Sequence, residues 1–168
     1  PILKKQLKKI FSLLIIFMTI DLNSQTVLLN SEDKLSIPLP LPYDGAIYSE
    51  IDVKKFMEAT TSKSKQPIII FGGNWCPDCR ILDGSLQVPS IKKFMSERFE
   101  IMHIDVGRYD KNMELMDYFG VAREKGVPRV IVFDKEMNIL NSSSTKEWTT
   151  ARERSLQDIF NYFQKLAL

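Results

Sequence analysis

The sequence contains few of the residues on which several classes of protein depend. Its 168 residues include only two cysteines and one histidine. Two cysteines cannot form a disulfide-stapled scaffold, and a tetrahedral zinc site would need two further ligands besides them. Hydrophobic residues make up 44% and charged residues 26% of the chain, close to the values of globular proteins, which excludes a disordered or collagen-like chain.

The chain also lacks an excess of charge of one sign. Four of its 23 Lys and Arg residues and one of its 21 acids lie in the first 24 positions, so the remainder is nearly neutral. A domain that binds nucleic acid normally presents a basic face, so no nucleic-acid partner is expected. The length predicts a single domain, because domains commonly span about 100–200 residues.

No apolar run is long enough to span a membrane. The longest, over residues 10–20, follows four lysines and precedes a polar stretch that contains the small residue Ser24. This order is typical of a secretory signal peptide, and a spanning helix needs about 20 apolar residues. Residues 1–24 are therefore predicted to be a signal peptide or a membrane-targeting segment. An uncleaved tether and a first buried helix of the domain are the alternatives.

The rest of the chain is predicted to form an extended connector over residues 25–48 and one domain over residues 49–168. Prolines between Ile37 and Tyr43 favour extended geometry in the connector. Ser49 and Asp52 resemble a capping box at the start of the first helix of the domain. The apolar pattern then predicts strand 68–71, helix 76–82 interrupted at 83–84, a helix from 89, strand 99–106, helix 112–119, strands 130–133 and 138–141, and a helix around 156–163. The order implies an α/β fold with a mixed sheet and helices on both faces.

Chemistry is concentrated in the segment Trp75-Cys76-Pro77-Asp78-Cys79, where a buried strand gives way to a helix. Two cysteines three positions apart can close a disulfide, and the first lies at the positive end of the helix dipole. That position favours the thiolate, which predicts Cys76 as the nucleophile. Cys79, one helical turn further and less exposed, is predicted to attack the mixed disulfide and release the reduced partner.

Three neighbours of the cysteines are expected to adjust their chemistry. Pro77 suits the first turn of a helix, where its missing N–H needs no partner. The carboxylate of Asp78 should oppose the thiolate, whereas the guanidinium of Arg80 should favour it. The residue types alone do not decide which of these two opposing effects is larger.

From about Ser49 to Leu166 the chain resembles the thioredoxin superfamily, and more closely its exported bacterial members. The resemblance rests on the order of elements, on the Trp-Cys-Pro-Asp-Cys motif, and on Gly126-Val127-Pro128 before a strand. It implies a thioredoxin-like fold with a central mixed sheet of about four to five strands. It also implies a cis peptide bond between Val127 and Pro128 that faces the cysteines. Trp75, Pro77, Val127 and Pro128 are then expected to contact substrate, with the backbone of Val127 pairing with it.

The chain departs from the thioredoxin pattern at several positions. Six residues before Cys76, where thioredoxins carry a buried Asp that assists deprotonation of the second cysteine, it has Ile70, and the usual strand lysine appears as Ile101. Four residues, 122–125, stand where thioredoxin has one, and Arg129 replaces the usual Thr. We interpret this charged insertion, with Arg129, as biasing the choice of partner. Shortening it should then change the exchange rates with different partners unequally.

The sequence predicts a thiol-disulfide oxidoreductase that exchanges disulfides with protein partners. No organic cofactor and no metal are expected, the redox-active pair being Cys76 and Cys79. A reductase or isomerase-like role is favoured, because Asp78 should stabilise the thiolate less than the His of strong oxidants. The chain is expected to be exported to the periplasm or another extracytoplasmic space, to act as a monomer, and to exchange electrons with a membrane donor or oxidase.

Two other functions are consistent with the same cysteines. A copper-handling thioredoxin-like protein could use the pair as ligands and recruit Met113 or Met116. An interaction module with a structural disulfide would resist mild reductants. His103, on a predicted strand, is expected to be a half-buried structural residue rather than a ligand.

Overall fold

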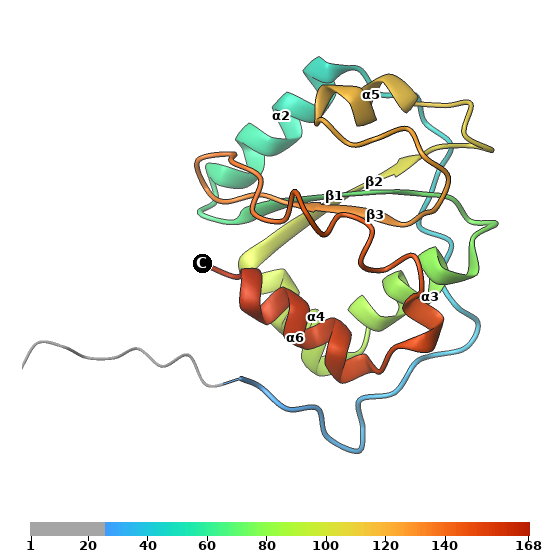
Figure 1. Cartoon of the computed structure of the whole chain (residues 1–168). Coiled ribbons are helices and arrows are strands. Elements are labelled where there is room, and N and C mark those ends of the chain that lie inside the picture. Colours follow the sequence, from blue (N-terminus) through green and yellow to red (C-terminus); the bar gives the residue numbers. More distant parts are fainter. Residues whose placement is uncertain (1–25) are drawn as a thin grey trace, which may run out of the picture.

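The computed structural model describes residues 26–168, and the predicted leader lies outside the described residues (Figure 1). The elements are α2 (Glu50–Thr61), β1 (Gln66–Gly72), α3 (Pro77–Leu86), α4 (Pro89–Arg98), β2 (Phe99–Asp105), α5 (Met113–Tyr118), β3 (Arg129–Val132), the 3-10 helix η1 (Ala151–Glu153) and α6 (Leu156–Leu166). Within residues 26–168, no helix is both long and apolar enough to cross a bilayer.

The sheet is mixed, as the order of elements predicts. Its strands lie in the order β2-β1-β3, with β1 parallel to β2 and antiparallel to β3. The central strand β1 is buried along its whole length, which is why its sequence is a continuous apolar run rather than an alternating one.

The described residues form three strands instead of the expected four to five. The segment predicted as strand 138–141 makes only an isolated bridge, between Phe133 and Ile139. The buried side chain of Asn141 accepts a hydrogen bond from the Val132 N–H at 2.9 Å and donates one to the Val130 carbonyl at 2.8 Å. An amide side chain therefore takes the place of strand pairing at two outer backbone groups of β3, while the Leu140 N–H donates to the Val132 carbonyl and the Val130 N–H donates to the Thr145 carbonyl.

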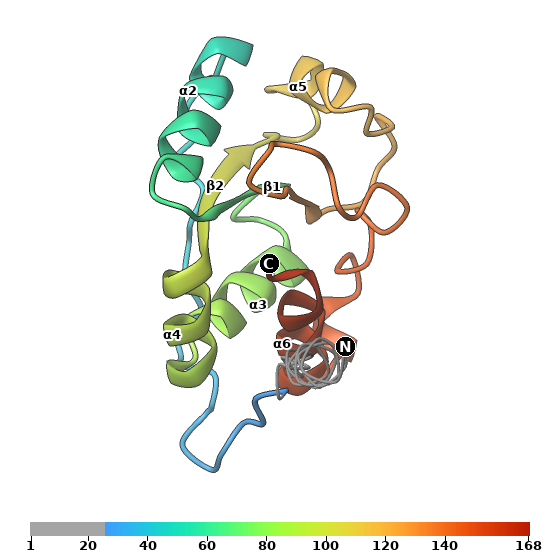
Figure 2. The same ribbon diagram turned by 90° about the vertical axis from the view of Figure 1, so that its left-hand side faces the viewer.

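Helices cover both faces of the sheet and enclose two apolar cores. Figures 1 and 2 show α2 and α5 over one face and α3, α4 and α6 over the other. Side chains of β1 alternate between them: Ile69 and Phe71 pack with α2 and α5, whereas Ile68 and Ile70 pack with the other three helices. Burial of these two faces is the main source of stability of the domain.

Local signals in the sequence set the helix ends. The capping box of Ser49 and Asp52 is present at the start of α2, and Pro89 is the first residue of α4. The expected interruption at 83–84 is wrong, because α3 continues to Leu86. Gly84 instead gives room for the connector, since a Cβ there would lie 3.0 Å from Leu39 Cδ2.

The connector is an integral part of the packing. Leu29 and Leu35 lie against the core below the sheet, and Asp33 accepts a hydrogen bond from the Ser90 N–H at the start of α4. Further on, Tyr43 is buried against the other core. Residues 26–48 therefore wrap the domain and bring an aromatic ring close to the cysteines.

Truncation of a core residue tests this account of the packing. Ile159 on α6 is 1% exposed, whereas Ile51 on α2 is 65% exposed. We expect Ile159→Ala to lower the free energy of unfolding by about 2–5 kcal/mol, because it leaves a cavity under the sheet. The matched control Ile51→Ala should change it by no more than about 0.5 kcal/mol. Equal losses in urea denaturation would contradict the account.

Candidate active site

The two cysteines lie where β1 turns into α3. After β1 ends at Gly72, the Cys76 N–H bonds to the Gly73 carbonyl in a tight turn, and Pro77 is the first residue of α3. Cys76 is thus the N-cap of the helix, and its sulfur accepts a hydrogen bond from the Cys79 N–H at 3.2 Å. A sulfur in this position receives both a backbone donor and the positive end of the helix dipole.

These contacts favour the thiolate of Cys76. A hydrogen bond from the Cys79 thiol lowers the pKa of Cys76 most, burial opposes it, the Cys79 N–H lowers it again, and the result is about 7. The charge of Asp78 raises this pKa, while its backbone N–H lowers it. A substantial fraction of Cys76 is therefore ionised near neutral pH.

Cys79 has the opposite character. Burial raises the pKa of Cys79 far above that of a free thiol, and the adjacent Cys76 raises it further. Cys79 is 1% exposed and Cys76 is 4% exposed. The site therefore contains one thiol prepared to ionise and, one helical turn away, a second that stays protonated.

A second backbone segment faces the cysteines. The peptide bond between Val127 and Pro128 is cis, as the resemblance implies. The thiol of Cys76 donates to the Val127 carbonyl at 3.4 Å, so residues more than 50 positions apart meet at the reactive sulfur. The N–H of Gly126 donates to the Tyr109 hydroxyl at 3.0 Å and ties this segment to the loop after β2.

Trp75 forms an exposed surface beside the cysteines. It is 37% exposed, although its indole N–H donates to the Gly107 carbonyl at 2.6 Å. The Arg108 guanidinium lies 4.6 Å from the centre of its ring, and Tyr109 meets it edge-on. Sequence reasoning missed Arg108 and Tyr109, because nothing near them in the chain marks the contact with Trp75. Pro77 is also exposed.

The charged neighbours of the motif are held by backbone groups. Asp78 is buried and accepts a hydrogen bond from the Arg152 N–H at 2.9 Å, with the Arg152 guanidinium 3.5 Å away. Arg80 donates to the carbonyls of Leu39 and Pro40, so its guanidinium binds the connector. Asp78 thus bears on the electrostatics of Cys76, while the contacts of Arg80 are with residues 39–40.

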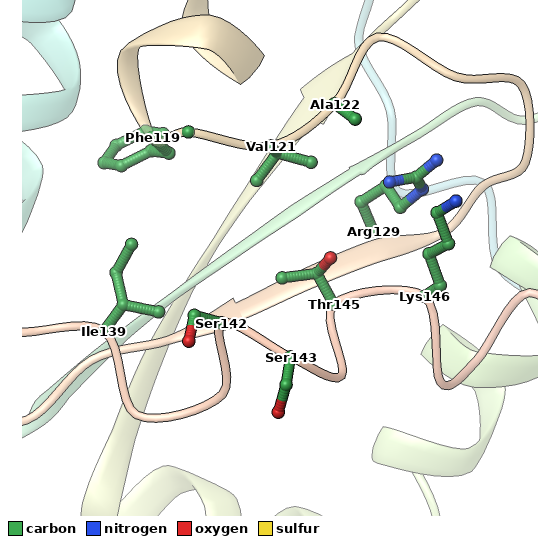
Figure 3. Close-up of a pocket in the computed structure, with 10 residues that line it drawn as sticks. Phe119, Val121, Ala122, Arg129, Ile139, Ser142, Ser143, Thr145 and Lys146 are labelled. Carbon is green, nitrogen blue, oxygen red and sulfur yellow. The ribbon is translucent and has the colours of Figure 1, made fainter.

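Arg129 supports the charged insertion from below. Its side chain is 1% exposed and donates to the carbonyls of Gly126 and Glu124, at 2.7 and 3.1 Å. Burial lowers the pKa of Arg129. Figure 3 shows it beside Lys146, which pairs with Glu124, in a pocket of about 280 Å³ that neither cysteine lines. Arg129 therefore shapes the loop that leads to Val127, and its side chain bonds to the carbonyls of that loop rather than to the cysteines.

The possible metal ligands are dispersed. Residues 26–168 contain no group of three or more His, Cys, Asp and Glu side chains that could hold a metal ion. His103 is half-buried on β2 with Nε2 2.9 Å from Asp83 Oδ1. Met116, on α5, is fully buried in the apolar core between the sheet, α2 and α5. Met113 packs against the edge of that core.

Comparison with known proteins identifies the family. A thioredoxin family model matches residues 43–145. The chain belongs to the thioredoxin family. A disulphide isomerase from Xylella fastidiosa Temecula1 is 35% identical over 76% of this chain and 97% of its own, with a TM-score of 0.68. The germline-specific thioredoxin Deadhead from Drosophila melanogaster shares the fold at 20% identity over 73% of this chain and 98% of its own, with a TM-score of 0.51. No curated protein sequence matched significantly.

The reactivity of Cys76 should follow the pKa of about 7. Because only the thiolate reacts, its alkylation rate in the reduced protein should fall about tenfold for each pH unit below the midpoint. Asp78→Asn should move the midpoint to lower pH, since it removes the charge that opposes ionisation, and Asp117→Asn, on the surface of α5, should leave it unchanged. A wild-type midpoint at the ordinary thiol value, or an upward shift in Asp78→Asn, would contradict this assignment.

Proposed function

We propose that this thioredoxin-family protein catalyses thiol-disulfide exchange with protein partners through Cys76 and Cys79. The observation that carries the proposal is the unequal environment of the two thiols, one at the helix N-terminus and one buried behind it. An enzyme of this kind needs one sulfur that attacks the partner's disulfide and a second that later attacks the mixed disulfide. The Xylella relative is named a disulphide isomerase, and that name is consistent with the same chemistry.

The exchange proceeds in two steps. The Cys76 thiolate attacks a disulfide of the partner, forming a mixed disulfide and releasing one partner sulfur as a thiolate. Cys79 then loses its proton and attacks Cys76, which closes the Cys76–Cys79 disulfide and releases the second partner sulfur. The partner gains two electrons and the cysteine pair loses two. The same steps in reverse oxidise a partner.

The partner is proposed to lie across Trp75, Pro77, Val127 and Pro128. Trp75 and Pro77 offer exposed apolar surface next to the Cys76 sulfur, and the Val127 carbonyl is already within 3.4 Å of it. An extended partner segment could pair with the Val127 backbone while its disulfide meets Cys76. The 122–125 loop and Arg129 would then influence which segments fit.

Export is proposed from the leader pattern of residues 1–24. Outside the cytosol a dithiol is kept reduced by a membrane electron donor or oxidised by an oxidase, so such a partner is part of the proposal, with the protein acting as a monomer and without an organic cofactor. Fractionation of cells that express the full-length protein tests this, and recovery only with cytosolic markers would contradict it.

The direction of electron flow is proposed to favour reduction or isomerisation. Potentials on this fold range from about −270 mV for thioredoxin to about −120 mV for a strong oxidant. Asp78 raises the pKa of Cys76, which limits stabilisation of the reduced form. Equilibration of the pair against glutathione should give a potential below about −150 mV. A higher value would contradict the preference for reduction.

Trapping tests the proposed exchange directly. Cys79→Ala should accumulate mixed disulfides with protein partners, because Cys76 still attacks and the resolving thiol is absent. The control Cys76→Ala should form none above background. Non-reducing electrophoresis, followed by release with dithiothreitol, measures both. If Cys79→Ala traps no partner and the wild-type protein binds copper stoichiometrically, the copper-handling alternative is favoured.

A further inference from the structure

The second step of the proposed exchange requires Cys79 to ionise in a buried position. Burial raises the pKa of Cys79 strongly, and the residues that the resemblance would place behind it as a proton relay are here Ile70 and Ile101. An apolar surrounding makes a thiolate costly unless a hydrogen-bond donor reaches the sulfur. The polar groups that face Cys79 therefore decide how fast the mixed disulfide is resolved.

Besides Cys76 and the Gly73 backbone, the side chain of Tyr43 reaches this sulfur. Its hydroxyl and the Cys79 sulfur border the same space, which exists because residue 72 is glycine: a Cβ on Gly72 would lie 2.3 Å from the hydroxyl oxygen and 2.8 Å from the sulfur. Tyr43 is 5% exposed, and among the described residues neither the Cys79 thiol nor any other group forms a hydrogen bond with its hydroxyl. A buried hydroxyl without a partner is costly, and a thiolate is a strong acceptor for it.

The backbone of Tyr43 is fixed against the active-site loop. Its N–H donates to Asn74 Oδ1 at 3.1 Å, and its carbonyl accepts from Asn74 Nδ2 at 2.7 Å. Asn74 is two residues before Cys76. These two hydrogen bonds therefore join the connector to the turn between β1 and α3, at the point where the Tyr43 side chain enters the core.

A histidine contacts the Tyr43 ring, and a carboxylate lies next to that histidine. His103 on β2 meets the Tyr43 ring edge-on at 5.4 Å, and its Nε2 lies 2.9 Å from Asp83 Oδ1. Asp83 is 5% exposed and follows Cys79 by one turn of α3. Burial raises the pKa of Tyr43 well above its ordinary value, and the charges of Cys79, Asp83 and Cys76 raise it further. The phenol therefore stays protonated and acts as a donor.

We propose that Tyr43 is a catalytic residue whose hydroxyl donates a hydrogen bond to the thiolate of Cys79, and that His103 and Asp83 position it. This inference rests on the proposed exchange. In the second step the Cys79 thiol gives its proton to a base in solution, and the Tyr43 hydroxyl stabilises the thiolate that remains. The thiolate then attacks the Cys76 sulfur. The bond between Cys76 and the partner breaks, and its electron pair leaves with the partner sulfur.

Tyr43→Phe removes the donor and keeps the ring. Rapid mixing of the reduced full-length protein with insulin, quenched in acid, separates formation of the mixed disulfide from its decay. We expect formation at the wild-type rate and decay slower by about tenfold or more, as for loss of a hydrogen bond to a charged group. In an NMR titration, Cys79 should ionise at higher pH than in the wild type, while Cys76 is little changed. The matched control Tyr48→Phe, a half-exposed tyrosine of the same segment, should alter neither readout.

His103→Ala provides a second variant that leaves the phenol in place. It should slow the decay of the mixed disulfide and move the Cys79 titration in the same direction as Tyr43→Phe, by a smaller amount. Wild-type decay and an unchanged Cys79 titration in Tyr43→Phe would overturn the assignment of Tyr43. Failure of the wild-type protein to form any mixed disulfide would overturn the proposed function instead, and the Cys79 titration would still decide whether Tyr43 stabilises the thiolate.

Discussion

The sulfur of Cys76 accepts a hydrogen bond from the Cys79 N–H, and this contact joins the fold to its chemistry. It exists because a buried strand ends at Gly72 and a helix begins at Pro77, so that the first cysteine caps the helix. The donor and the helix dipole favour a thiolate at one sulfur only. Burial of the second sulfur raises its pKa and keeps it protonated.

Segments distant in the chain complete the site around this junction. The Val127 carbonyl before Pro128 meets Cys76, Arg129 holds the loop that leads there, and Arg108 and Tyr109 flank Trp75. The connector supplies Tyr43 behind Cys79. The face proposed to meet a partner and the proposed donor to the buried thiol thus both lie against the short turn between β1 and α3.

The parts of this arrangement that could be predicted are those encoded locally. Apolar runs and capping residues predict the helices, the mixed sheet and the position of the cysteine motif, because periodicity and helix ends depend on neighbouring residues. The predicted strand 138–141 is reduced to an isolated bridge, because the Asn141 side chain occupies two of the outer backbone groups of β3 that a strand would pair. Gly84 suggested a break in the helix, but it lies within α3, where the absence of a side chain leaves room for Leu39. Tyr43 and Asp83 were missed because only the folded chain brings them to Cys79 and His103.

The central claim is that the fold lowers the pKa of Cys76 and raises the pKa of Cys79. An NMR titration of the reduced protein, with the Cβ carbons of both cysteines labelled, measures this directly. The account predicts that Cys76 titrates with a pKa of about 7 and that Cys79 stays protonated through the pH range in which Cys76 ionises. Titration of both cysteines together near the free-thiol pKa of about 8.5 would contradict it.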